Sequence, residues 1–515
     1  MKKITLTFFL LLAFALHAQT FEWLKTPPIT FSSNPDMIGY ATAHDPSGNV
    51  YLSGFKENSF NYSEIFGDVF YNKYDDQGNL QFSKTFTGHV TVYDMVSDFE
   101  GNIIVVAGFV NLFSVDDWAI DTVEQGIQNL ILKFDASGAL LWHRQMTIDD
   151  SFECRAHTAT VDTTGNVYIG YYDFMHSFIK KLSPDGDTLM TITQANARSV
   201  QSISIDNQGN IYAAGSCADP GATFAGVTVS PSLLYNTFIV KYSAEGTYQW
   251  VRYVEDITCP EPQVVAHSPD EVYFCSYLFD NYSFDGIPTE GPQTMFSDIF
   301  ITKLNASGIF QWVREVPGSG YINTGNRRFL SGDADGNIYF AGSMRGTINW
   351  NTEMTTISNG FSNEAIVLKY NPQGDLLLAK TAGGASNDRF DAVSVNAQGD
   401  IFLAGMSNGT ASFDGIQHEV AQFQNWPFLA KMTMNTFSTA EQELQQLVLY
   451  PNPASDYLYI SNTAQTFAGS IFNVLGQNVS DFEINTTHPV SVASLPKGTY
   501  LIKLNQSRTI KFVKN

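Results

Sequence analysis

The sequence is poor in charge, and the charge that it has is mostly negative. Asp, Glu, Lys and Arg make up only 15% of the 515 residues, and 51 acidic against 28 basic side chains give a net charge of −23. An acidic surface repels the phosphates of nucleic acids and of anionic membranes, so both are disfavoured as partners. No stretch beyond the N-terminus approaches the run of about eighteen apolar residues that indicates a spanning helix, so we expect no transmembrane segment in the mature chain.

Cysteine and histidine are also scarce, which argues against a metal site. The four cysteines, Cys154, Cys217, Cys259 and Cys275, show no Cys-x-x-Cys spacing, and no histidine pair stands at zinc-ligand spacing near them. We therefore expect no metal and no cofactor. Cys259 and Cys275 are the nearest pair and lie in one repeat, so they could meet across neighbouring strands. The alternative is that all four are buried thiols.

The N-terminus has the features of an export signal. Lys2 and Lys3 precede an apolar run, Leu6–Leu16, that is too short to span a bilayer, and the small residue Ala18 stands at the expected cleavage position. We expect residues 1–18 to be a removed signal peptide, and an exported location permits disulfides.

Aromatic residues are abundant, and many of them lie in a repeat. Aromatics make up 14% and apolar residues 44% of the chain, which suits pleated sheets. A phrase close to Asp-x-x-Gly-Asn-Val-Tyr recurs along the chain. Its glycines are Gly48, Gly101, Gly165, Gly209, Gly336 and Gly399. A degenerate copy at residues 267–273 fills the double interval in this series, so we count seven copies.

A second phrase follows the first and runs to a tryptophan. Examples are residues 131–142, 239–250 and 301–312. In both phrases Asp, Asn or Ser opens a tight turn by bonding its own backbone, and Gly supplies the positive φ that closes it. The flanks alternate apolar and polar residues, as half-buried strands do. Each repeat therefore predicts four strands, and no long amphipathic helix pattern appears.

Seven four-stranded repeats predict an all-β fold, a seven-bladed β-propeller over residues 19–435, with a solenoid as the alternative. The seventh repeat has a third strand at residues 428–431 but lacks a tryptophan-bearing fourth strand. Residues 21–25 have the pattern of such a strand, so we expect the first strand to complete the last blade. This closure would remove the exposed sheet edges that an open array leaves.

The repeats resemble the bacterial β-propeller repeats called SBBP, over about residues 21–433, a family defined by fold and not by one activity. Tryptophan recurs at one position of the repeat, and we interpret it as blade packing rather than as a platform for sugar. The residues at this position are Trp23, Trp142, Trp250 and Trp312.

The C-terminal tail carries three blocks, at residues 448–460, 473–477 and 495–515. Their marker residues are Pro451, Asn452, Pro453, Gly476, Gly498, Tyr500 and Lys511. These blocks resemble the type A C-terminal sorting domain of the type IX secretion system of Bacteroidetes. The resemblance implies the type IX machinery as a partner and a secreted or surface-attached protein. We expect a small β-sandwich at residues 447–515, after a polar linker at residues 436–446.

A polar or aromatic side chain stands eight residues before the repeat glycine in each copy. For the fifth copy this assignment, Gln263, assumes that the turn is one residue short. In a propeller this position lies on the innermost strand, so we predict a ring at one channel mouth. The ring residues are Tyr40, Tyr93, His157, Gln201, Gln263, Arg328 and Asp391. Such groups suit a sugar or a short peptide, and Arg155, Arg198, Arg327 and Arg389 would add positive charge. The alternative is that the mouth is polar only because it is wet.

No catalytic constellation stands out. There is no Gly-x-Ser-x-Gly elbow and no His-Glu-x-x-His helix. Asp335 and Asn337 look like the start of a calcium loop, but Gly342 occupies the position of the required Glu, so we interpret this segment as a turn.

Three hypotheses follow for the function. The first is an exported, non-catalytic propeller that binds a glycan, a peptide or a surface protein. The second is an extracellular polysaccharide- or peptide-acting hydrolase or lyase, in which His157, Arg328 and Asp391 converge on one substrate. The third is a structural or adhesive surface protein. Whether the chain is an enzyme stays open, with the non-catalytic hypothesis favoured.

Overall fold

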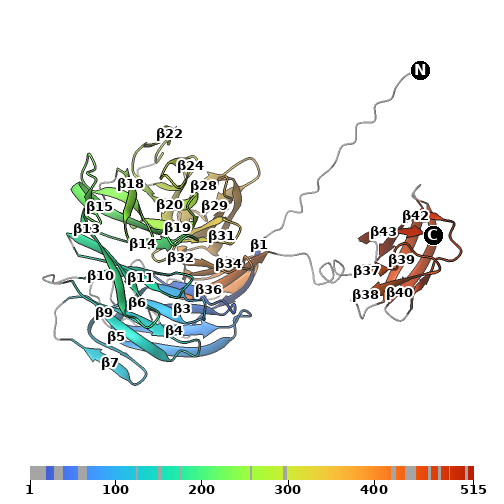
Figure 1. The fold of residues 1–515 in the computed structure, drawn as a ribbon, viewed down its shortest axis with the longest axis horizontal. Coiled ribbons are helices and arrows are strands. Elements are labelled where there is room, and N and C mark those ends of the chain that lie inside the picture. The colour runs from blue at the N-terminus through green and yellow to red at the C-terminus, as the bar shows by residue number, and fades with distance from the viewer. Residues whose placement is uncertain are drawn as a thin grey trace, which may run out of the picture. The chain divides into compact units, whose positions relative to one another are not determined.

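The chain folds into two compact units, Thr20–Thr433 and a second that includes Met434–Asn515, and each is described by itself. The structure is a computed structural model, and all its regular elements in the described residues are strands (Figure 1). The predicted all-β class is therefore confirmed. None of the described residues forms a helix long and apolar enough to cross a membrane. The described residues are 19–27, 39–55, 67–122, 126–148, 154–173, 175–255, 258–293, 298–418, 425–434, 448–461, 466–473, 477–485, 488–504 and 508–515.

The first two sheets of the larger unit hold the first four repeats. One sheet contains, in order, β2 (Ala41–His44), β3 (Val50–Phe55), β4 (Gly67–Tyr74), β5 (Leu80–Ser97), β6 (Ile103–Val115), β8 (Gln128–Phe134) and β9 (Leu140–Met146), with β7 (Trp118–Asp121) paired to β6. The next contains β10 (Arg155–Val161), β11 (Val167–Tyr172), β12 (His176–Leu182), β13 (Thr188–Ala197), β15 (Ile211–Phe224), β17 (Asn236–Tyr242) and β18 (Tyr248–Val254), with β14 (Ser202–Ile205) and β16 (Val227–Thr228) paired to β15.

The other sheets of this unit hold the last three repeats. One contains β19 (Gln263–Ser268), β20 (Glu271–Leu278), β23 (Asp298–Leu304) and β24 (Phe310–Glu315). The next contains β25 (Tyr321–Thr324), β27 (Ile338–Arg345), β30 (Glu364–Tyr370), β31 (Leu376–Gly384), β34 (Ala411–Phe413) and β35 (Ile416–His418), with β26 (Leu330–Gly332) paired to β27. Two hairpins stand apart, β21 (Ser283–Phe284) with β22 (Ile287–Pro288) and β28 (Thr347–Asn349) with β29 (Thr355–Ile357).

The first strand of the chain pairs with the last strand of the larger unit. The sheet order is β1 (Gln19–Lys25), β36 (Asn425–Met434), β33 (Ile401–Asn408) and β32 (Asp388–Val395). Lys431 Nζ on β36 lies 3.1 Å from Glu22 Oε2 on β1. In Figure 1, β1 and β36 lie together, whereas β14, β19 and β32 lie toward the middle of the unit.

The repeat phrases form tight hairpin turns, as predicted. The six repeat glycines all have φ between 79° and 85°, the left-handed region that favours glycine. Asp45 opens the first turn, since its Oδ1 accepts the backbone N–H groups of Ser47 and Asn49. In the degenerate copy Ser268 pairs directly with Glu271, so a shorter turn replaces the one that needs glycine.

The middle strands of the sheets are buried on both faces because one sheet packs on the next. Every residue of β3 and β8 is buried, which explains their near-continuous apolar character. One core cluster joins Tyr273 and Ile301 of one sheet to Ile338 and Ile366 of the following sheet. The apolar core is therefore spread between the sheets, and the strand ends are left to form sites.

The C-terminal unit consists of two antiparallel sheets around one core. The first contains β37 (Val448–Tyr450), β38 (Tyr457–Ser461) and β41 (Val490–Ser491), and the second contains β40 (Asn478–Ile484), β39 (Phe467–Asn473), β42 (Gly498–Leu504) and β43 (Arg508–Lys514). Leu458 of the first sheet and Ile471, Ile502 and Phe512 of the second belong to the same buried cluster. This is the two-sheet packing of a β-sandwich.

Candidate functional site

Five of the seven predicted ring residues line one small cavity. These five are Tyr93, His157, Gln201, Gln263 and Arg328. The cavity measures about 40 Å³. A water molecule occupies about 30 Å³ of liquid, so this space admits water and not a sugar ring or a peptide.

The side chains around the small cavity form a connected wall. The rings of Tyr93 and His157 stack with centroids 4.3 Å apart, and His157 Nδ1 lies 2.8 Å from Gln201 Oε1. Gln201 in turn donates from Nε2 to the hydroxyl of Tyr172, at 3.2 Å. With the Gln201 oxygen as acceptor, His157 donates from Nδ1 to it.

On the other side of the small cavity, two arginines form bonds to residues of distant repeats. Arg328 directs Nε and Nη2 to the two carboxylate oxygens of Asp94 on β5, and Nη2 also donates to the carbonyl of Ala159 on β10. Arg327 lies over the ring of Tyr93, 5.6 Å from its centroid, and donates to the hydroxyl of Thr91. Paired, partly buried guanidinium groups of this kind fix the relative positions of the strands that they join.

Tyr40 and Asp391 do not line that cavity. Tyr40 is 1% and Asp391 0% exposed, and the backbone N–H of Tyr40 donates to Asp391 Oδ2 at 3.4 Å. Arg389 Nε donates to Asp391 Oδ1 at 2.7 Å. Burial raises the pKa of Asp391, while Arg389 opposes that shift. The side chain of Asp391 therefore does not line the small cavity with His157 and Arg328, although its backbone carbonyl accepts the N–H of Arg327 at 2.9 Å.

A larger pocket of about 360 Å³ adjoins the small cavity. Gln201 and Glu261 line both spaces, so the two share a wall. The volume falls within the range of about 300–1,000 Å³ typical of small-molecule sites. The residues that line it are Arg155, Tyr172, Asp173, Arg198, Ser199, Gln201, Ser216, Cys217, Cys259 and Glu261.

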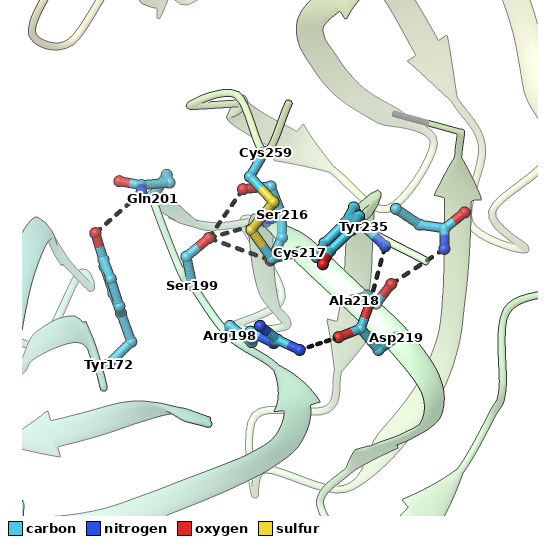
Figure 2. The surroundings of a disulfide bond; sticks show 11 residues. Tyr172, Arg198, Ser199, Gln201, Ser216, Cys217, Ala218, Asp219, Tyr235 and Cys259 are labelled. Carbon is cyan, nitrogen blue, oxygen red and sulfur yellow. Dashed lines mark hydrogen bonds and ion pairs between the residues drawn. A yellow bond between two sulfur atoms is a disulfide. The ribbon is translucent and has the colours of Figure 1, made fainter. Parts of the chain in front are cut away.

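A disulfide between Cys217 and Cys259 forms part of the pocket wall (Figure 2). The predicted proximity of Cys259 and Cys275 is therefore wrong. Cys275 lies within β20, where its side chain is fully buried in the core. Cys217 instead lies at an irregularity within β15, and Cys259 lies on the connection between β18 and β19. Cys154 and Cys275 are buried free thiols, and burial raises the pKa of Cys154 to about 12.

Arg198 is fixed at the edge of the pocket. Figure 2 shows its guanidinium directed to Asp219, with which Nη2 forms an ion pair, and Arg198 also lies 5.8 Å from the ring centroid of Tyr235. Ser199 donates to and accepts from Ser216, which fixes the wall beside the disulfide. The side chain of Arg198 is 39% exposed, so it faces both the solvent and the pocket.

The predicted ring residues lie beside the larger pocket, but the pocket itself was not predicted from the sequence. Arg155 and Arg198 were expected nearby and do line it, but Tyr172, Asp173 and Glu261 were not anticipated. Tyr172 ends the second strand of its repeat, Asp173 follows that strand, and Glu261 lies on the connection between two repeats. The sequence signal for these three residues is their position at the end of a predicted strand or on the connection between two repeats.

The sorting-motif residues lie in the C-terminal unit. Asn452 donates to the carbonyl of Lys511 and accepts the N–H of Val513, so the Pro-Asn-Pro segment is tied to the last strand. Tyr500 stacks on Phe512 with centroids 5.5 Å apart. Pro451 and Pro453 flank Asn452 on the surface, Gly498 begins β42, and Gly476 lies outside the described residues.

Known families account for this unit. The secretion system C-terminal sorting domain family matches residues 448–515. This segment is a type IX sorting domain. It identifies the chain as a protein exported to the cell surface or the medium, and the sorting domain implies contact with the type IX machinery. No curated protein sequence matches the chain.

Solved structures resemble the chain only distantly. A Dos1 propeller is 10% identical, with a TM-score of 0.40 over 80% of this chain and 96% of that one. YCF48 bound to a D1 peptide is 8% identical, with a TM-score of 0.39 over 81% and 96%. A puromycin hydrolase is 10% identical, with a TM-score of 0.40 over 92% and 59%. Likenesses at this level carry no argument about function.

Proposed function

We propose that the larger unit is a closed ring of seven blades. The support is that its strands can be grouped into seven successive sets of four, with the long strand β5 serving both the first and the second set and with β32, β33, β36 and β1 as the last set. Contacts link the inner strands of successive sets in the cyclic order β2, β5, β10, β14, β19, β26 and β32, and β32 contacts β2. Closure also explains why the tryptophan-bearing strand stands first in the chain rather than last.

A contact that recurs between consecutive blades supports the closure. Trp142, Trp250 and Trp312 each donate from Nε1 to a carbonyl in the second turn of the following repeat, the acceptors being Pro184, Ala306 and Pro372. Trp23 on β1 makes the same contact with Asp76 of the first repeat, at 3.0 Å, and Lys431 on β36 also donates to Asp76. The contact of Trp23 with the first repeat therefore supports closure, because it matches the contact that these three tryptophans make with the repeats that follow them.

The propeller acts, in this proposal, as an exported binding module without catalytic activity. Its ligand site is the pocket framed by Cys217 and Cys259, and the single observation that carries this is a ligand-sized pocket lined by arginines, carboxylates and amides. The site lies beside the ring residues that the sequence predicted, but outside the water-sized cavity that most of them line. A glycan, a peptide or a surface protein segment fits this chemistry.

The hydrolase alternative gains no specific support. It needs His157, Arg328 and Asp391 around one substrate, but the buried carboxylate of Asp391 does not line the cavity that the other two line and is bonded by Arg389. Arg328 is already engaged by Asp94 and Ala159. The structural or adhesive alternative leaves the pocket without a role, so the binding module accounts for more of the molecule.

The export proposal extends to the segments outside the described residues. Residues 1–18 are proposed as the removed signal peptide and residues 436–446 as the linker between the propeller, residues 19–435, and the sorting domain, residues 447–515. In this proposal the sorting domain serves as the export signal and takes no part in the ligand site.

A binding array tests the proposed site. The mature chain is applied to immobilised glycans and peptides, beside a Gln201→Ala variant and a matched Gln311→Ala variant on the exposed side of β24. We expect ligands that bind the wild type and the β24 variant but lose at least about tenfold in affinity with Gln201→Ala. Binding that Gln201→Ala leaves unchanged would move the site elsewhere, and no binding at all would favour the structural alternative.

A further inference from the structure

The pocket beside the disulfide carries side chains of both charge signs on one wall. Arg155 begins β10, and Arg198 follows β13. Asp173 follows β11, and Glu261 lies on the connection that leads into β19. The pocket is thus neither a basic patch nor an acidic one, although the chain as a whole is strongly acidic.

We propose that this pocket binds a zwitterionic ligand, a short peptide with a free amino group and a free carboxylate. This inference rests on the proposed function of the same site and names its ligand class. The carboxylate would lie against Arg155 and Arg198, and the ammonium group against Glu261. Gln201, Ser199 and Tyr172 supply uncharged donors and acceptors for the peptide group between the two charges.

The basic side of the pocket is held in place before any ligand arrives. Asp219 pairs with Nη2 of Arg198, and Tyr235 packs on the same guanidinium. The backbone N–H of Arg198 donates to the carbonyl of Cys217. Its guanidinium has no further hydrogen bond or ion pair among the described residues, so Nε and Nη1 remain available. A guanidinium fixed on one side loses little side-chain entropy on binding, and it presents paired donors to a carboxylate.

The acidic side depends on the disulfide. Cys259 lies two residues before Glu261, and its bond to Cys217 fixes this connection to β15. Pro262 is buried, whereas Glu261 is exposed at the rim and has no ion-pair or hydrogen-bond partner among the described residues. Asp173 is the weaker candidate, because its Oδ1 already accepts the N–H groups of Met175 and His176.

The presence of both charge signs in the pocket selects the ligand class. A neutral sugar would displace water from the two arginines and from Glu261 without replacing their charge-assisted bonds, which costs binding energy. A purely anionic ligand would meet Glu261, and a purely cationic one would meet the arginines. Only a ligand with both charges satisfies the whole wall.

Calorimetry with blocked dipeptides tests the assignment. The mature chain is titrated with alanyl-tyrosine, with its N-acetyl form, with its C-terminal amide and with the doubly blocked form. Hydrogen bonds to charged groups contribute about 1.5–3 kcal/mol, so each block is expected to weaken binding at least about tenfold. Glu261→Gln should remove the penalty of N-acetylation only, and Arg155→Gln the penalty of amidation only. Glu290→Gln, on an exposed site outside the pocket, should change neither.

The outcomes separate the two proposals. Equal binding of the free and blocked dipeptides, or binding of a neutral oligosaccharide that Glu261→Gln leaves unchanged, would overturn the zwitterion assignment while a binding function stands. If no dipeptide and no glycan binds the mature chain, the binding function itself fails. Loss of selectivity in both pocket variants, with wild-type unfolding temperatures, would establish the assignment.

Discussion

At the scale of single residues, the most unusual feature is a pair of buried carboxyl groups, Glu364 and Asp388. They are 7% and 1% exposed, and a Cβ at Gly383 would collide with both Glu364 Oε2 and Asp388 Oδ2, so the two groups are neighbours. Asp388 accepts the N–H groups of Gly384 and Asn408, and Glu364 accepts that of Asn359. Burial raises the pKa of Asp388 to about 8, with a smaller contribution from the charge of Glu364, and burial raises the pKa of Glu364 to about 7.

The raised pKa values of this pair predict that the folded chain loses stability as the pH rises. The folded chain retains protons that the unfolded chain has released, so the free energy of unfolding falls as the pH rises from about 4 to about 8. Glu364→Gln keeps an acceptor for Asn359 and turns an amide donor toward Asp388. We therefore expect it to raise the free energy of unfolding at pH 9 by about 1–3 kcal/mol and to flatten the pH dependence.

Denaturant unfolding between pH 5 and pH 9 measures this effect. Glu353→Gln, on an exposed loop, is the matched control and should leave the profile unchanged. An identical pH dependence in Glu364→Gln and in the wild type would show that the pKa of Glu364 is not raised in the folded chain.

The sequence predicted the turn residues better than the site residues. The Asp and Gly of each turn act on their own backbone and on that of near neighbours, so a few residues of sequence are enough to predict their roles. The site residues act across the fold: Arg328 pairs with Asp94, and Glu261 joins Arg198 only after the sheets assemble. The position eight residues before each repeat glycine identified residues on the innermost strands. It could not identify residues such as Glu261 that lie on the connections between repeats.

At the scale of elements, the disulfide joins β15 to the connection before β19. It closes a loop with a sequence separation of 42, and loop-closure entropy for that length corresponds to about 4 kcal/mol. We expect the Cys217→Ser/Cys259→Ser double variant to lower the free energy of unfolding by about 2–4 kcal/mol. Sequence proximity pointed to the wrong partner for Cys259, because Cys275 is fully buried within β20 whereas Cys259 lies on the connection before β19, beside β15.

Thiol counting checks the pairing independently of stability. The unfolded wild type should react at two thiols without reductant, Cys154 and Cys275, and at four after reduction. The double variant should react at two thiols under both conditions, and reductant should leave its unfolding curve unchanged. Four reactive thiols in the unreduced wild type would contradict the bond.

At the scale of the whole molecule, the sequence predicts two properties for different reasons, an exported chain and a closed ring. The sorting domain was predicted from motifs that a family shares. The closed ring was inferred from an element out of place, the tryptophan strand at the start of the chain. The pairing of β1 with β36 agrees with that inference, and the recurring tryptophan contact gives it a physical basis. The ligand was not readable, because it depends on a pocket built from several repeats.

Closure of the ring by the first strand is the central claim, and complementation tests it most directly. Deleting residues 19–25 removes Trp23 and Glu22, exposes an edge of β36, and should lower the free energy of unfolding of the propeller by at least about 3–5 kcal/mol. A synthetic peptide of residues 19–27 added to the deleted chain should restore most of that loss, and the same peptide with Trp23→Ala should restore much less. Unchanged unfolding of the deleted chain, or a peptide without effect, would contradict the closed ring.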